Sequence, residues 1–180
     1  MTTAIVRELA DREAIRSLKF FYARCADAVD VDGMLSVFTD DCVVNFRADR
    51  SDERRGREAA RDFFATAQSV VVSSSHHLSN MDIVFHGLDR AAMHSVLYSW
   101  QRFTGYPDVA DRHRWARYED VFVRTADGWR QSELLCLVAG EIGGPTEPRL
   151  GEVLAAPTWP GRSWPAPTWT AATWTGTERP

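Results

Sequence analysis

Apolar side chains in the first third of the chain recur at steps of three and four residues. Over residues 11–28 this pattern predicts a helix with one buried face, marked by Ile15, Leu18, Phe21, Tyr22, Cys25 and Val29. Asp30 is placed to cap a second short helix, with an apolar stripe made of Val31, Met34, Leu35 and Phe38. A strand is predicted over 42–46, and a third helix over 57–67 carries Ala60, Phe63 and Phe64 on its apolar side.

The next part of the chain has the pattern of β-strands. Candidate strands cover 77–86, 91–103, 114–124 and 129–140, with turn signals at 87–89 and 126–128. Three helices therefore precede a mostly antiparallel sheet. This order predicts an α+β fold, in which helices cover one face of a curved sheet and leave a cavity between the layers. Such a cavity is a natural site for a small molecule.

Composition divides the chain near Gly143. A length of 180 residues suits one domain, which we place at 1–143. The segment 144–180 is rich in Pro, Thr, Ala and Gly, has no helical or alternating pattern, and spaces Trp159, Trp164, Trp169 and Trp174 five residues apart. No regular element places that period on one face. The tail is predicted to be a flexible extension or, alternatively, a docking strip whose indoles are buried against a partner.

Charge and residue usage exclude several classes of function. A net charge of -4 argues against a nucleic-acid partner. The chain lacks a run of about 18 apolar residues, and its first residues lack a basic and then apolar segment, so we expect no membrane span, no secretory signal and a cytoplasmic location. Cys25, Cys42 and Cys136 form no C-x-x-C pair and are expected to be buried free thiols. The histidines show no metal-ligand spacing and no phosphate-binding glycine loop is present, so neither a metal nor a cofactor is expected.

Four segments between Asp11 and Leu134 carry a resemblance to a known family. They read DREAIRSLKFFYARCADAVDVDGMLSVFTDDCVV, GREAARDFF, HHLSNMDIVF and RYEDVFVRTADGWRQSEL. Together they resemble the nuclear transport factor 2-like superfamily, in particular its SnoaL-like branch of polyketide cyclases, dehydratases and isomerases. The resemblance implies a cone-shaped α+β barrel with three N-terminal helices on a curved, mostly antiparallel sheet that encloses a pocket. It also implies a homodimer or a higher homo-oligomer.

The same resemblance implies a catalytic trio. Scytalone dehydratase-like and bile-acid 7α-dehydratase-like proteins use a tyrosine and an aspartate of the first helix with a histidine that begins a strand, which correspond here to Tyr22, Asp27 and His77. A neutral imidazole is the best base at neutral pH, so His77 is the expected base. Asp27 would hold its other N–H, and Tyr22 would donate a hydrogen bond to a substrate oxygen. Because strand residues alternate, only one of His76 and His77 faces inward, and a shift of one residue reverses the assignment.

Further residues are expected to line the pocket and bind substrate. They are His76, His94, Tyr98, Trp100, Phe46 and Tyr118. His94, Tyr98 and Trp100 share one face of a regular strand, although core packing is the alternative role for them. Likewise, Tyr22 could be a core residue and Asp27 a helix cap. Related dehydratases place a second titrating residue on the middle strand, and this chain has Trp100 at or near that position.

The function expected from these residues is that of a cofactor-independent dehydratase, isomerase or cyclase. Its substrate would be a hydrophobic, oxygenated polycyclic or polyketide-like molecule of the kind found in secondary metabolism. The alternative is a non-catalytic ligand-binding or assembly subunit, similar to the small subunit of ring-hydroxylating dioxygenases.

Overall fold

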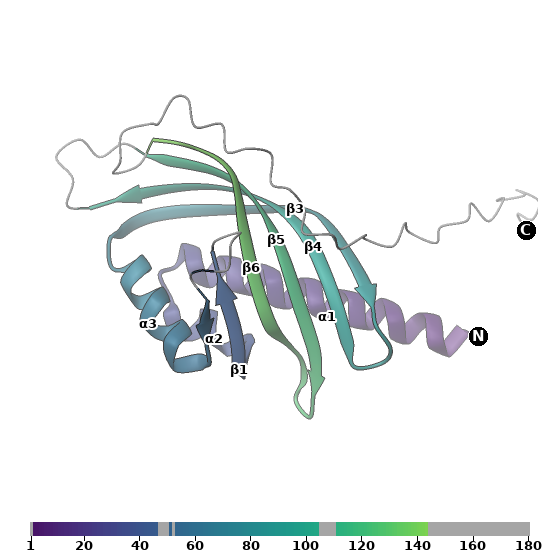
Figure 1. Cartoon of the computed structure of the whole chain (residues 1–180). Helices are drawn as coiled ribbons and strands as arrows, with labels where there is room; N and C mark the ends of the chain where they lie inside the picture. Colours follow the sequence, from purple (N-terminus) through teal and green to yellow (C-terminus); the bar gives the residue numbers. More distant parts are fainter. Residues whose placement is uncertain (1, 47–50, 52, 105–110, 144–180) are drawn as a thin grey trace, which may run out of the picture.

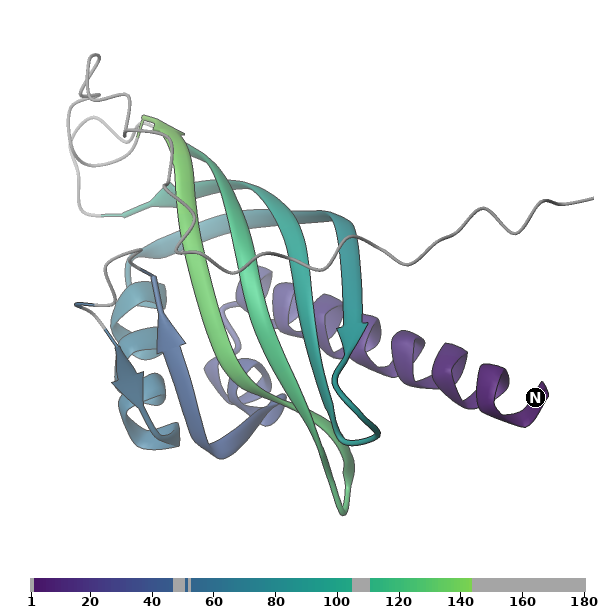
Figure 2. The same ribbon diagram turned by 45° about the vertical axis from the view of Figure 1, so that its right-hand side comes forward.

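The computed structural model describes residues 2–46, 51, 53–104 and 111–143. Within these ranges the helices are α1 (Thr2–Asp27), α2 (Val31–Ser36) and α3 (Arg57–Gln68). The strands are β1 (Phe38–Asn45), β2 (Arg54–Arg55), β3 (Val71–Phe85), β4 (Arg90–Phe103), β5 (Arg112–Thr125) and β6 (Gly128–Ile142). The helices pack under a curved sheet (Figure 1). The turned view in Figure 2 shows the sheet bending over them, with the N-terminal end of α1 extending beyond it.

The sheet of the described chain has the order β2-β1-β6-β5-β4-β3. Strands β3 to β6 form an antiparallel meander, and β1 joins β6 as a parallel neighbour. The prediction of an α+β fold, with helices against a curved and mostly antiparallel sheet, is therefore confirmed. Its inner face carries the core and the cavity.

Several element boundaries differ from the predicted ones. Helix α1 begins at Thr2 rather than near residue 11, and its added turns expose Ile5, Val6 and Leu9. These turns bury no apolar face, so hydrophobic periodicity could not mark them. Strand β3 begins at Val71 rather than at residue 77, because it pairs with β4 back to Phe103. Its first residues are two valines followed by three serines on an edge strand, so they show no apolar–polar alternation that would predict a strand.

The core consists of two groups of side chains. One lies between the sheet and helices α2 and α3, and includes Leu35, Phe38, Phe64 and Leu134. The other lies between the sheet and α1, and includes Ile15, Met93 and Phe122. The free thiols of Cys25, Cys42 and Cys136 are buried, as expected.

A buried ion pair joins α1 to the sheet. Lys19 Nζ lies 2.8 Å from Asp120 Oδ2, and both side chains are fully buried. Gln131 donates from Nε2 to Asp120 Oδ1 at 2.8 Å. Burial raises the pKa of Asp120 to about 6, although the ammonium of Lys19 acts in the opposite direction. This pair fixes the middle of α1 over β5.

The predicted tail, with its four evenly spaced tryptophans, lies outside the described residues. Among the helices that are described, none combines the length and apolar character that a membrane crossing requires.

Candidate active site

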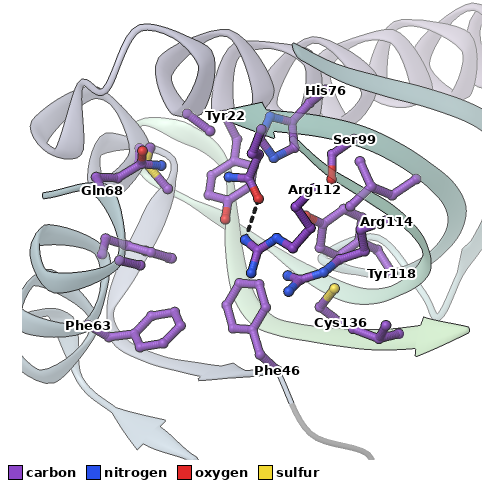
Figure 3. Close-up of a pocket in the computed structure, with 17 residues that line it drawn as sticks. Tyr22, Phe46, Phe63, Gln68, His76, Ser99, Arg112, Arg114, Tyr118 and Cys136 are labelled. Atoms are coloured by element: carbon purple, nitrogen blue, oxygen red, sulfur yellow. Dashed lines mark hydrogen bonds between the residues drawn. The ribbon is translucent and has the colours of Figure 1, made fainter. Parts of the chain in front are cut away.

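A cavity of about 330 Å³ lies between the helices and the inner face of the sheet (Figure 3). Its apolar wall comes from α1, α2, α3 and the strands, and includes Ala26, Met34, Phe46, Phe63, Phe64, Leu97 and Val138. Its polar side chains are those of Tyr22, Gln68, His76, Ser99, Gln101, Arg112, Arg114 and Tyr118, with the thiol of Cys136. The cavity is large enough for a small organic molecule.

The end of α1 directs Asp27 toward the sheet. Val29 takes a left-handed conformation with φ 58°, and the N–H of Asp30 donates to the carbonyl of Cys25 at 2.8 Å. This pattern terminates a helix within one turn. A β-branched residue rarely adopts such a backbone conformation, so the bend is held by its surroundings. Asp27 therefore lies at the last helical position, facing the start of β3.

Asp27 and His76 form a hydrogen-bonded pair at the cavity. Asp27 Oδ1 lies 2.6 Å from His76 Nδ1, and Oδ2 accepts the backbone N–H of His76 at 3.1 Å. Ser74 Oγ donates to Asp27 Oδ1 at 3.1 Å. Burial raises the pKa of Asp27, but the hydrogen bonds from His76 and Ser74 lower it by a larger amount. The pKa of Asp27 therefore lies below its usual value. Asp27 is thus ionised at neutral pH.

An ionised Asp27 determines the tautomer of its partner. A carboxylate only accepts hydrogen bonds, so Nδ1 of His76 must carry the proton that lies between the two groups. In a neutral imidazole the lone pair then belongs to Nε2. Since His76 lines the cavity, Nε2 is the atom available to a bound molecule.

The expected position of His77 is wrong. Its side chain is exposed, and its Nε2 lies 3.0 Å from Ser75 Oγ. The ring packs 5.6 Å from that of Tyr98, centroid to centroid, on the outer face of the sheet. Adjacent residues of a strand point to opposite faces, so the contact with Asp27 that brings His76 inward turns His77 outward.

The expected placement of three residues of β4 in the cavity wall is also wrong. His94, Tyr98 and Trp100 share one face, as predicted, but they are half-buried on the outer side, and none of them lines the cavity. Tyr98 forms a 2.8 Å hydrogen bond with His113 there. The inner face of β4 instead presents Leu97, Ser99 and Gln101. The prediction chose the wrong face of β4 because its aromatic residues, typical of a pocket wall, lie on the outer face.

Phe46, Tyr22 and Tyr118 do line the cavity, in agreement with their predicted positions. Figure 3 shows the hydroxyl group of Tyr22 pointing into it. Burial raises the pKa of both tyrosines well above 10, so each phenol stays protonated and able to donate. The ammonium of Lys19 lies 3.6 Å from the ring centroid of Tyr118 and 5.1 Å from that of Tyr22. The buried ion pair therefore also supports the two tyrosines.

Sequence reasoning missed two arginines in the cavity wall. Arg112 Nη2 donates to Gln101 Oε1 at 2.6 Å, and Arg114 Nε donates to Glu141 at 2.7 Å. Burial and the neighbouring charge of Arg114 lower the pKa of Arg112 to about 10, so it is still a cation at neutral pH. A signal was present, because counting back from Tyr118 in steps of two reaches both positions. Among the described residues, no group of three or more His, Cys, Asp or Glu side chains could hold a metal ion.

A curved sheet that closes over helices around such a cavity is the cone-shaped fold of nuclear transport factor 2-like proteins. The family model of the SnoaL-like domain matches residues 7–134, and the chain belongs to that family. The match covers the helices and strands that contribute to the cavity, apart from residues 2–6 of α1 and residues 135–142 of β6, which include the cavity residues Cys136 and Val138.

Solved structures with the same fold include proteins with different described activities. A candidate scytalone dehydratase from Novosphingobium aromaticivorans has a TM-score of 0.71 at 22% identity, over 83% of this chain and 97% of that chain. A candidate aromatic ring hydroxylase from the same species has a TM-score of 0.69 at 25% identity, over 76% and 94%. A hexachlorocyclohexane dehydrochlorinase, LinA type 3, from Novosphingobium barchaimii has a TM-score of 0.68 at 17% identity, over 79% and 96%. No curated protein matches the chain at a significant level.

Proposed function

We propose that the chain is a cofactor-independent dehydratase that acts on a hydrophobic β-hydroxy carbonyl compound. The observation that carries this proposal is the pair of His76 and Asp27 at the cavity, with the ionised carboxylate on Nδ1. This arrangement leaves Nε2 as a base of fixed orientation. Tyr22 supplies a neutral hydroxyl donor in the same cavity.

The proposed reaction removes water through an enolate. Nε2 of His76 takes a proton from the carbon next to the substrate carbonyl. The C–H electron pair forms the C=C bond of the enolate, and the π pair of the carbonyl moves onto its oxygen. The phenol of Tyr22 donates a hydrogen bond to that oxygen. The enolate then forms the new C=C bond and expels the β-hydroxyl group. The imidazolium of His76 gives its proton to the departing oxygen, so water leaves and the neutral base is restored.

Two further observations support an elimination in this cavity. The helix side of its wall carries aromatic and aliphatic side chains, among them Met34, Phe63 and Phe64, which suit a hydrophobic ring system, whereas the polar groups lie mainly on the strands. The similar structures include a candidate scytalone dehydratase and a dehydrochlorinase, and their names describe the loss of water and of hydrogen chloride. Isomerisation and aldol-type ring closure also pass through an enolate, so the same groups would serve a cyclase or an isomerase.

The direct test uses 3-hydroxy-1-tetralone, a β-hydroxy ketone that becomes 1-naphthol after loss of water. We expect the protein to accelerate formation of 1-naphthol, followed by its fluorescence, above the rate in buffer. A panel of larger polycyclic β-hydroxy ketones extends the assay. Saturable binding of the panel without turnover would contradict the proposal and favour the non-catalytic ligand-binding or assembly subunit.

Substitution of Asp27 tests whether this carboxylate positions the base. We expect Asp27→Asn to lower kcat by about 10- to 100-fold, as for other groups that orient a functional histidine, with little change in KM. Asp27→Glu, which keeps a carboxylate, should recover part of the lost kcat. Asp32→Asn, which changes an exposed carboxylate paired with Arg61, is the matched control. An unchanged kcat in Asp27→Asn, or a loss of kcat that Asp27→Glu does not relieve, would contradict the positioning role.

We also propose that the chain forms a homodimer through the outer face of its sheet. Tyr98 packs there against His77, His113 and Trp115, with ring centroids 5.6 to 6.1 Å apart, and Trp115 is 42% exposed. Exposed aromatic clusters are typical of interfaces. Trp115→Glu should convert a dimer into a monomer in sedimentation velocity, whereas Leu88→Glu, at an exposed hairpin, should not. A monomeric wild-type chain would contradict this proposal.

A further inference from the structure

Two guanidinium groups lie in the cavity on a different strand from the proposed base. His76 pairs with Ser99 in the sheet register, and Ser99 pairs with Arg114. These three side chains line the cavity in one row across β3, β4 and β5. Neighbouring strands are about 4.8 Å apart, so the backbones of His76 and Arg114 are separated by about 10 Å. Arg112 lies two residues along β5 on the same face.

The two arginines differ in how their charge is balanced. Arg114 is paired with the carboxylate of Glu141. Arg112 instead donates to the neutral amide of Gln101, and its guanidinium carbon lies 4.4 Å from the ring centroid of Phe103. Its Nε is buried, and no acceptor for it exists among the described residues. A buried donor without an acceptor is costly, and the one nearby carboxylate, that of Glu141, acts on Arg112 while it is bound to Arg114, so two cations share one anion.

We infer that Arg112 and Arg114 form an anion subsite that binds one carboxylate of the substrate, away from the carbon that His76 deprotonates. This inference rests on the proposed function for its description of the reacting end, but binding alone can test it. A guanidinium group binds a carboxylate through two parallel hydrogen bonds. Since Glu141 already compensates one of the two cations, a group with a single negative charge balances the subsite better than a dianion such as phosphate.

The subsite gives the cavity two ends with different tasks. The carboxylate would anchor the molecule at β5, and its apolar body would lie along Phe46 and Phe63, whose rings are 5.0 Å apart. The reacting carbon would then be presented to His76 on β3. Binding energy from a group that does not react can be used to orient the part that does.

The experiment compares 2-naphthoate with 2-naphthamide, which has the same ring system and no charge. Isothermal titration with the full chain should give a Kd for the acid about tenfold or more below that for the amide, as expected for a charge-assisted pair. Arg112→Gln should reduce this preference to about twofold or less, and Arg112→Lys should restore only part of it, because lysine keeps the charge without the planar fork. Arg90→Gln removes an exposed cation paired with Glu133 at the far end of β4, and should leave the preference unchanged.

Two results in the wild-type chain and the arginine variants would overturn the inference. One is equal affinity for acid and amide, or no measurable binding of either, in the wild-type chain. The other is an unchanged preference in folded Arg112→Gln and Arg114→Gln, with folding checked by circular dichroism. His76→Gln separates this inference from the proposed function, because it should keep the preference for the acid whether or not the chain catalyses elimination. Loss of the preference in that variant would also contradict a subsite on β5.

Discussion

Replacement of His76 by glutamine is expected to reduce dehydration of 3-hydroxy-1-tetralone by about 10²- to 10⁴-fold in kcat, the usual contribution of a positioned acid-base group. Glutamine keeps a polar side chain of similar length but cannot take a proton at neutral pH. The substitution also removes the partner of Asp27, whose Oδ1 lies 2.6 Å from the imidazole. The measurement is the initial rate of 1-naphthol formation across pH, with KM determined in parallel.

The neighbouring histidine provides a matched control. His77→Gln makes the same chemical change one residue further along β3, on the outer face of the sheet. Its turnover should stay within about twofold of the wild type, as for a surface substitution away from the site. If His77→Gln lost activity while His76→Gln kept it, the original assignment of the base from the sequence would be right, and the mechanism drawn from the cavity would be wrong.

The second large effect concerns the buried ion pair. Lys19→Met is expected to lower the free energy of unfolding by about 3–5 kcal/mol, because it leaves the charge of Asp120 buried without its cation. Methionine has a similar length, so the loss of packing is small. Urea unfolding followed by tryptophan fluorescence measures the change. Arg90→Gln breaks an exposed pair with Glu133 and should cost less than about 1 kcal/mol.

The pH dependence of that deficit follows from the sign of the pKa shift. The pKa of Asp120 is raised to about 6 in the folded protein, so the folded state binds this proton more tightly than the unfolded state. Its contribution to stability is greatest below the unfolded pKa of about 4, and is lost as pH rises through 6. Without Lys19 the loss should be larger, so the deficit of Lys19→Met should grow from pH 4 to pH 7. Lys19→Met combined with Asp120→Asn should recover much of the stability; a double variant as unstable as the single one would contradict this account.

The sequence predicted the fold class and most helices and strands more accurately than the positions of individual side chains. The steps of Ile15, Leu18 and Tyr22 located the buried face of α1, since periodicity records which residues meet the core. Phe21 and Val29, predicted on the same face, are exposed. The sheet order was not predictable, because the parallel contact of β1 with β6 joins segments distant in sequence. The first turns of α1 and the start of β3 were missed for the same reason: their residues bury too little apolar surface to leave a pattern.

The candidate site could be predicted only in part, because the sequence did not show which face of a strand each side chain occupies. Asp27 and Tyr22 could be proposed from the family resemblance of the first helix, whereas the choice between His76 and His77 depended on a single residue of register. Polar residues occupy both faces of β3 around them, so the sequence contained no hydrophobic alternation to decide it. Arg112 and Arg114 could have been predicted from the expected inward position of Tyr118, because they lie four and six residues before it on the same strand face.

Lys19 is the only lysine in the sequence, and its ammonium is fully buried against Asp120. The folded protein consequently offers no lysine amine to acylating reagents, to cross-linkers or to enzymes that attach modifying groups at lysine. Any covalent change at Lys19 requires α1 to separate from β5. The rate at which this one amine reacts therefore reports how often α1 separates from the sheet. The same separation would remove the contacts of Lys19 with the rings of Tyr22 and Tyr118.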